Sequence, residues 1–164
     1  MADVLSPQQR SYCMSRIRGK DTKPERVVGT GLFALGFRYR LHVRKLPGCP
    51  DLVFPKHRAV IFVHGCLWHG HGCHLFRWPK TNARFWRKKI TRNSTNDQVA
   101  TRELRLAGWR VLTIWECALR GRYRLDQQCL ITRAAQWVLA GRAQAQIGVK
   151  RASRTTQFVS KRHS

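Results

Sequence analysis

Histidine and cysteine side chains are concentrated in the stretch IFVHGCLWHGHGCHLF, which spans residues 61–76. Within it, Cys66, His71 and Cys73 have the spacing C-x4-H-x-C, which offers three ligands for a metal ion. A structural zinc site needs four such ligands in a tetrahedron, so a fourth has to come from elsewhere in the chain. The alternative is a set of ordinary buried thiols beside a loop histidine.

Cys117 is the best candidate for the fourth ligand. It follows the apolar run 110–116, much as Cys66 follows the apolar run 59–63. If these two runs are neighbouring strands with the same direction, both cysteines emerge at one edge of a sheet. The resulting Cys3His site would be closed to water, and its Zn²⁺ would therefore be structural.

Two further histidines of this stretch, His64 and His69, remain outside the predicted metal shell. His64 ends a strand-like run, and His69 lies between two of the candidate ligands, in a loop that a bound metal would stiffen. A rigidly held imidazole suits general acid–base catalysis. The alternative is that both are solvated surface histidines.

Asp51 stands at the start of an apolar strand in the segment PGCPDLVF. A carboxylate in such a place is costly unless it is paired or bound to a metal. Mg²⁺ prefers carboxylate, carbonyl and water oxygens, so Asp51 is a candidate magnesium ligand. The alternative is a turn residue that follows Pro50.

The charge of the chain indicates a polyanionic partner. Thirty-two Lys and Arg residues stand against eight Asp and Glu residues, a formal net charge of +24. Nucleic acid is the commonest partner for such an excess, and no long amphipathic helix favours a membrane surface instead. The strongly apolar run 59–63 is too short to cross a bilayer, and no secretion signal is visible near residue 1. We therefore expect a cytoplasmic protein whose cysteines are thiols or metal ligands.

Periodicity of apolar residues predicts the elements that must position these side chains. The predicted helices cover residues 7–18, 22–36, 81–107 and 126–140, the third with an interruption at residues 93–96. The predicted strands cover residues 37–43, 51–54, 59–63 and 110–116, the second and third forming a hairpin. This order predicts an α/β fold with a mixed central sheet flanked by helices.

Three regions are expected along the chain. Residues 1–20 would be a basic helical arm that clamps DNA, and residues 21–142 would be the catalytic domain. Residues 143–164 are polar and basic, and we expect them to be a flexible tail.

Five segments together resemble the very-short-patch repair (Vsr) endonucleases over residues 1 to 141. They are MSRIRGKDTKPE, LPGCPDLVF, AVIFVHGCLWHGHGC, FWRKKI and AGWRVLTIWECALRG, in this order. The resemblance implies a restriction-endonuclease-like three-layer core of the PD-(D/E)xK superfamily. It also implies recognition of T:G mismatches that arise when 5-methylcytosine deaminates, and Mg²⁺-dependent nicking 5′ of the mismatched thymine. The enzyme would act on double-stranded DNA as a monomer at the bacterial nucleoid, with mismatch-repair proteins as candidate partners.

The resemblance implies metal ligands residue by residue. Asp51 and the backbone carbonyl of Val63 would bind Mg²⁺, and Glu25 would bind a metal-bound water. Threonine is usual at position 63, so Val63 fits only because the ligand is the carbonyl. The family's structural zinc ligands match Cys66, His71, Cys73 and Cys117.

The resemblance also implies roles for the histidines. His69 would be the general base or would orient the attacking water, His64 would contact the phosphate, and Asp97 would support the histidine. The usual second acid and lysine of the nuclease core are missing from the family and from this chain. More of the chemistry therefore falls to the imidazoles.

Aromatic and basic side chains are the predicted DNA contacts. Trp68, Trp86 and Leu67 would insert beside the mismatch, although the family has an aromatic wedge at position 67 and leucine stacks poorly. For Trp86, packing in the core of its helix is the alternative. The basic residues expected to grip the backbone include Arg16, Arg18, Lys20, Lys88 and Lys89.

Two other functions remain open from the residues alone. One is a restriction-type endonuclease that acts on fully paired DNA. The other is a zinc-stabilised DNA-binding module without catalysis, which would leave Asp51, His64 and His69 without a role.

Overall fold

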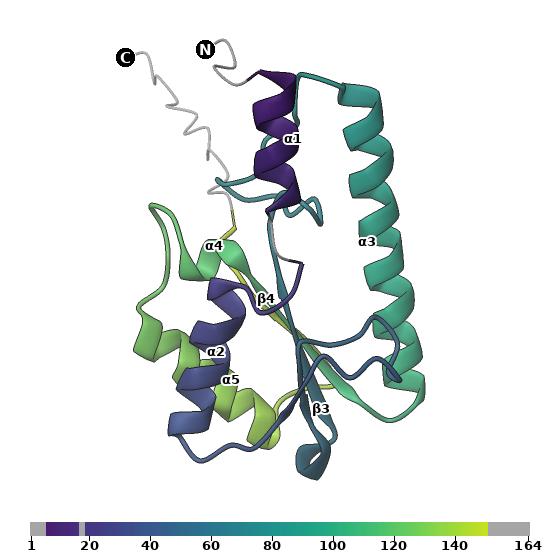
Figure 1. Cartoon of the computed structure of the whole chain (residues 1–164). Coiled ribbons are helices and arrows are strands. Elements are labelled where there is room, and N and C mark those ends of the chain that lie inside the picture. Colours follow the sequence, from purple (N-terminus) through teal and green to yellow (C-terminus); the bar gives the residue numbers. More distant parts are fainter. Residues whose placement is uncertain (1–5, 17–18, 151–164) are drawn as a thin grey trace, which may run out of the picture.

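A mixed five-stranded sheet forms the centre of the molecule (Figure 1). The computed structural model describes residues 6–16 and 19–150. The strands, in the spatial order β1-β2-β3-β4-β5, are Arg40–Leu41, Leu52–Phe54, Ala59–His64, Arg110–Trp115 and Gln144–Ile147. β1 pairs with β2 and β2 with β3 in antiparallel fashion, whereas β4 is parallel to both β3 and β5. The predicted mixed sheet is therefore confirmed, including the β2–β3 hairpin.

Helices cover both faces of this sheet. The helices are α1 Pro7–Ser15, α2 Lys23–Ala34, α3 Ala83–Leu106, α4 Glu116–Leu119 and α5 Gln127–Ala140, with a 3-10 turn at Pro55–His57. Figure 1 shows α2 and α5 on one face and the long α3 on the other. Within residues 6–16 and 19–150, no helix is both long and apolar enough to span a bilayer.

Two hydrophobic clusters join these layers. On the α2 and α5 side, Val28, Leu32 and Leu130 pack against strand residues such as Ile61, all with no exposed surface. On the other side, Leu104 of α3 packs with residues that include Val53, Val60, Phe62 and Val111. Burying both faces explains why the two central strands are apolar along nearly their whole length.

Helix α2 begins at the position that the capping pattern predicted. The Thr22 side chain accepts a hydrogen bond from Glu25 N–H, and Pro24 lies in the first turn, where its missing N–H costs nothing. Glu25 Oε2 in turn accepts from the backbone N–H of Asp21 at 2.8 Å. Glu25 is thereby fixed at the helix start with its side chain only 8% exposed.

The register of β3 and β4 positions the site. These strands are parallel, and His64 pairs with Trp115 at their carboxyl ends. Cys66 and Cys117 each follow two residues later, so both leave the sheet at the same edge. The predicted parallel arrangement of these two strands is confirmed.

The predicted strand 37–43 was too long, and the predicted break in the helix at residues 93–96 is absent. Strand pairing is confined to Arg40–Leu41, because His42 has a left-handed backbone (φ 46°) that turns the chain away. α3 continues without a break through residues 93–96. Its polar residues there point to the loop and the solvent, as when Asn93 donates to the carbonyl of Trp68, and they leave the helix intact.

The predicted flexible tail from residue 143 was wrong for its first part. Gln144–Ile147 form β5 beside β4, and Ile147 is buried. Gln146 accepts a hydrogen bond from the indole of Trp115 at 3.0 Å. This strand is rich in glutamine, which in the sequence alone is typical of a solvated segment. Residues 151–164 of the predicted tail lie outside the described residues.

Candidate active site and metal clusters

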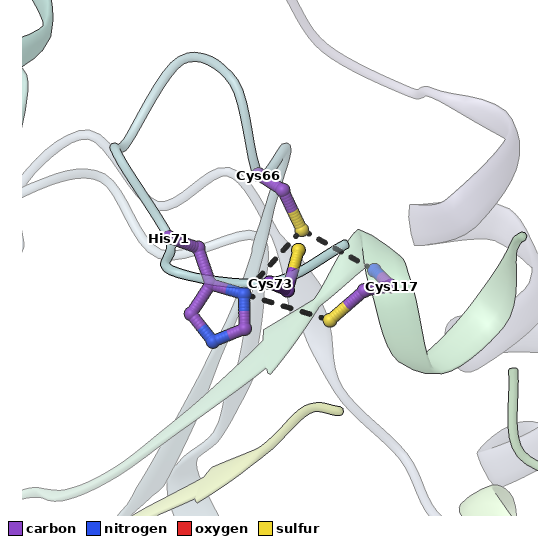
Figure 2. A group of neighbouring side chains, drawn as sticks. All are labelled: Cys66, His71, Cys73 and Cys117. Carbon is purple, nitrogen blue, oxygen red and sulfur yellow. Dashed lines mark hydrogen bonds between the residues drawn. The ribbon is translucent and has the colours of Figure 1, made fainter. Parts of the chain in front are cut away.

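The four predicted zinc ligands meet at one end of the sheet. Figure 2 shows Cys66, His71 and Cys73 on the loop after β3, and Cys117 at the start of α4, pointing toward a common centre. One donor atom of each lies within 4.8 Å of all the others. His71 Nδ1 is 3.6 Å from Cys66 Sγ and 3.5 Å from Cys117 Sγ. The cluster can therefore hold a metal ion.

The surroundings of this cluster fix its ligands in place. The His71 ring stacks on Trp115 at 4.2 Å between centroids, nearly in parallel at 7°. Cys117 N–H donates to Cys66 Sγ, and Val149 N–H donates to Cys117 Sγ at 3.2 Å. Burial raises the pKa of the Cys66 and Cys117 thiols. The segment after β5 thus completes the shell of the cluster.

His64 and His69 form a second cluster with Asp97 of α3. The two imidazoles stack face to face, with ring centroids 3.8 Å apart and only 2° between their planes. His69 Nδ1 lies 2.5 Å from Asp97 Oδ2, and His64 Nδ1 lies 3.9 Å from the same oxygen. A carboxylate only accepts, so the proton of this short bond belongs to His69 Nδ1 and the Nε2 lone pair is available. This arrangement suits His69 to accept a proton.

His64 differs from its partner because it is more deeply buried. Burial, followed by the charge of a protonated His69, lowers the pKa of His64 to about 4, although Asp97 opposes the shift. Within the described residues, His64 Nδ1 also has no hydrogen-bond partner. His64 is therefore neutral at neutral pH, and it can contact an anion only as an N–H donor.

The loop that carries His69 is tied to α3. Asn93 Nδ2 donates to the carbonyl of Trp68 at 2.8 Å. Gly70 has a left-handed backbone (φ 66°), and a Cβ there would lie 3.0 Å from Ile90 of the same helix. A side chain at position 70 would therefore both strain the turn and push the loop away from α3.

Asp51 lies in a third cluster, with Glu25 and His42. Asp51 Oδ2 accepts a hydrogen bond from Val63 N–H at 2.7 Å. Burial raises the pKa of Asp51 to about 7; the Val63 hydrogen bond opposes this, Glu25 adds to it, and His69 lowers it. One donor atom of each of Glu25, His42 and Asp51 lies within 4.8 Å of the other two, so this cluster can also hold a cation.

The second and third clusters adjoin one another. Asp51 accepts a hydrogen bond from Val63, and His64, which follows Val63 in β3, stacks on His69. The two clusters are therefore neighbours at the carboxyl end of β3, joined through Val63 and His64.

Aromatic rings and a lysine form a patch beside the site. Trp68 and Trp86 are both half-buried, with ring centroids 5.5 Å apart. Lys89 Nζ lies 5.1 Å from the centre of the Trp68 ring and 5.6 Å from that of Trp86. Phe85, which the sequence analysis did not single out, is 56% exposed next to them. Trp86 therefore lies at the surface rather than in the core.

The remaining predicted DNA contacts are spread over the surface. Leu67 is half-buried in the loop after β3, and Lys88 is exposed on α3. Arg16 and Lys20 are exposed near the N-terminus, whereas Arg18 lies outside the described residues. His42 is the other site residue that sequence reasoning missed. No local sequence pattern marks His42, because a left-handed turn places it in the third cluster.

Comparisons with known proteins agree with this geometry. Residues 2–75 match the family model described as DNA mismatch endonuclease Vsr. The DNA mismatch endonuclease Vsr of Escherichia coli is 43% identical over 147 residues, covering 90% of this chain and 94% of that protein. The Type II nicking enzyme V.XorIIP of Xanthomonas oryzae is 48% identical over 119 residues, 73% of this chain and 88% of that enzyme. V.NmeAIP of Neisseria meningitidis, also named a Type II nicking enzyme, is 42% identical over 122 residues, 74% of this chain and 87% of that enzyme.

These relatives are 42–48% identical to this chain over most of both chains. The chain belongs to the Vsr family of DNA mismatch endonucleases.

Proposed function

We propose that this endonuclease recognises T:G mismatches in double-stranded DNA and nicks the strand 5′ of the mismatched thymine. The observation that carries the proposal is the His69–Asp97 pair, with the buried carboxylate of Asp51 in the neighbouring cluster, linked to it through Val63 and His64. The mismatch would arise from deamination of 5-methylcytosine, and the nick would initiate very-short-patch repair. The name of the Escherichia coli relative supports a mismatch as substrate.

Mg²⁺ is the cofactor we propose for Asp51. The carboxylate of Asp51 is buried, and burial without a cation holds its pKa at about 7, so a bound cation would relieve the cost of its charge. The carbonyl of Val63 would supply a further oxygen of the kind that Mg²⁺ prefers, and Glu25 would bind a metal-bound water. When bound, the metal would neutralise charge on the phosphate that is attacked.

His69 would take the proton from the attacking water. The carboxylate of Asp97 holds Nδ1 protonated, which orients the ring and leaves Nε2 as the base. His64, neutral at neutral pH, would donate its N–H to a phosphate oxygen of the scissile bond. The stacked rings would thereby divide proton transfer and phosphate binding between them.

The aromatic patch would recognise the mismatch. Trp68, Trp86 and Leu67 would enter the base stack, which costs a few kcal/mol for each step that is opened. A T:G wobble costs less to open than a Watson–Crick pair. Lys89, together with Arg16, Lys20 and Lys88, would contact the phosphates on either side, and Arg18 joins this set as a sequence-based prediction.

Zn²⁺ is the metal we propose for the cysteine–histidine cluster. In tetrahedral zinc with bonds of about 2.3 Å to sulfur and about 2.0 Å to nitrogen, sulfur and nitrogen donors lie about 3.5 Å apart. The distances of 3.5 and 3.6 Å from His71 Nδ1 to two sulfurs fit that geometry. The four ligands leave no position for water, so the zinc would hold the His69 loop rather than act in catalysis.

We further propose that the enzyme acts as a monomer at the bacterial nucleoid and cooperates with mismatch-repair proteins. A second candidate function is nicking of fully paired DNA at a specific sequence. It is favoured by the names of relatives such as V.XorIIP and V.NmeAIP, which are Type II nicking enzymes.

A nicking assay separates these two candidates. Two pools of end-labelled duplexes are incubated with the zinc-loaded enzyme and Mg²⁺. Both pools carry the same randomised flank, and they differ only in the central pair, which is T:G in one and C:G in the other. We expect nicks 5′ of the thymine in the T:G duplex alone, at flanks that sequencing of the products identifies. Equal nicking of the C:G duplex would support the restriction-type function and contradict the mismatch proposal.

A further inference from the structure

His42 lies between the two carboxylates of the candidate catalytic metal site. Its Nε2 is 3.4 Å from Glu25 Oε2, and its Nδ1 is 3.6 Å from Asp51 Oδ1. The side chain of His42 is 18% exposed, that of Asp51 16% and that of Glu25 8%. Three groups that bind metals therefore share one largely buried space at the start of α2 and β2.

Hydrogen bonding does not account for the position of the His42 ring. Within the part of the chain that the structure describes, Nε2 is buried and has no hydrogen-bond partner. A buried polar nitrogen without a partner costs about 1–3 kcal/mol, so such groups call for an explanation. Both of its contacts with carboxylates are longer than ordinary charge-assisted hydrogen bonds, which lie near 2.8 Å. The spacing suits donors arranged around a common ion.

The backbone holds His42 in this position at a cost. Its φ of 46° is left-handed, which is uncommon for a residue other than glycine. The N–H of His42 donates to the backbone carbonyl of Asp51 at 3.2 Å, just beyond the paired residues of β1 and β2. Strained residues of this kind gather at functional sites, where the surrounding structure enforces them. The turn thus fixes the imidazole next to Asp51.

Glu25 retains the capacity to bind a cation in spite of its role at the start of α2. Its carboxylate accepts from Asp21 N–H at 2.8 Å and from the Thr22 hydroxyl at 2.9 Å. An ionised carboxylate has about four lone-pair sites, so two remain for other partners. The two hydrogen bonds orient the group toward His42 and Asp51.

We propose that His42 is a further protein ligand of the divalent cation in the active site, in addition to Asp51 and the Val63 carbonyl and next to Glu25. This inference rests on the proposed catalytic role of Asp51. An imidazole nitrogen among the oxygens disfavours Mg²⁺, which prefers oxygen ligands, relative to first-row transition metals. The site is therefore a mixed nitrogen–oxygen site that binds Mn²⁺ more tightly than Mg²⁺, while Mg²⁺ still supports the proposed reaction.

Mn²⁺ binding to the zinc-loaded full-length enzyme without DNA tests this proposal. Pulsed electron paramagnetic resonance is expected to detect a directly bound nitrogen on Mn²⁺, and this coupling should disappear in His42→Gln. Calorimetry should show that the variant binds Mn²⁺ at least about tenfold more weakly than the native enzyme. The ratio of Mg²⁺ to Mn²⁺ affinity should rise, because a glutamine oxygen replaces the nitrogen.

His57→Gln is the matched control, because His57 lies in the β2–β3 turn, outside all three clusters. It should keep both the nitrogen coupling and the Mn²⁺ affinity. A nitrogen coupling that persists in His42→Gln, or Mn²⁺ bound by oxygen alone in the native enzyme, would overturn the proposal. His42 would then only lie between the two carboxylates without binding the metal.

The outcome is independent of the mismatch proposal. If the enzyme nicks T:G duplexes but Mn²⁺ shows no coupling to a His42 nitrogen, the inference fails and the proposed function stands. If the coupling is present but T:G duplexes are not nicked, the metal site stands and the proposed substrate fails.

Discussion

Replacement of His69 by alanine is expected to slow T:G nicking by about 10²- to 10⁴-fold, the range in which a general base contributes to catalysis. The variant lacks the imidazole whose Nδ1 lies 2.5 Å from Asp97 Oδ2, and therefore lacks the base that Asp97 orients. Affinity for the mismatched duplex should stay near that of the native enzyme, because the aromatic patch is unchanged. Single-turnover nicking rates and a binding titration in Ca²⁺ measure the two effects separately.

His57→Ala is the control for that experiment, since His57 lies at the opposite end of β3 from His64. It should nick at the native rate. The nicking rate of Asp97→Asn should lie between those of His57→Ala and His69→Ala, because the amide no longer enforces the tautomer with Nε2 as the base. Native nicking rates in His69→Ala would exclude His69 as the base.

Loss of a cysteine–histidine ligand is expected to have the largest effect on stability. Cys117→Ser should lower the zinc content and destabilise the fold by about 3 kcal/mol or more, because structural zinc contributes directly to folding free energy. For a domain of this size, that loss corresponds to a fall of about 10 °C in Tm. Zinc analysis by mass spectrometry and thermal unfolding check both. Nicking should fall as well, because His69 lies in the loop that the cluster holds.

Cys129→Ser is the matched control, because Cys129 is exposed on α5 and lies outside the cluster. It should retain zinc and Tm. Equal effects of Cys117→Ser and Cys129→Ser would contradict a structural metal at the cluster.

The part of the site that lies at the ends of strands could be predicted from the sequence. Apolar runs that precede Cys66 and Cys117 indicated two strands, and parallel pairing was enough to bring the cysteines together. Asp51 could also be predicted from the sequence, because a carboxylate at the start of a buried strand needs a partner. These inferences need only the strand pattern and the cost of burying charge.

The remainder depends on tertiary contacts that leave no local pattern. β5 is rich in glutamine and is stabilised by pairing with β4 and by Trp115, neither of which its own residues reveal. The polar residues of α3 suggested a break, whereas contacts such as that of Asn93 with the His69 loop use them within an intact helix. His42 was missed because a left-handed turn, rather than sequence spacing, places it beside Glu25 and Asp51.

Asp51 is the carboxylate that we propose to bind the catalytic metal, and the proposed chemistry depends on it more than on any other side chain. Asparagine at this position keeps the shape of the side chain and can accept the Val63 hydrogen bond, but it has no charge. Because burial raises the pKa of Asp51 from 3.8 to about 7, folding stability falls as pH rises between these values, and the full cost of the charge is present above about pH 7. Asp51→Asn should therefore be at least as stable as the native enzyme in magnesium-free buffer above neutral pH.

The single-turnover rate of T:G nicking by Asp51→Asn in Mg²⁺ tests this claim most directly. We expect the variant to bind the mismatched duplex like the native enzyme and to nick it about a thousandfold more slowly or not at all, because the metal contributes several kcal/mol to transition-state stabilisation. Nicking by Asp51→Asn at the native rate would contradict the account.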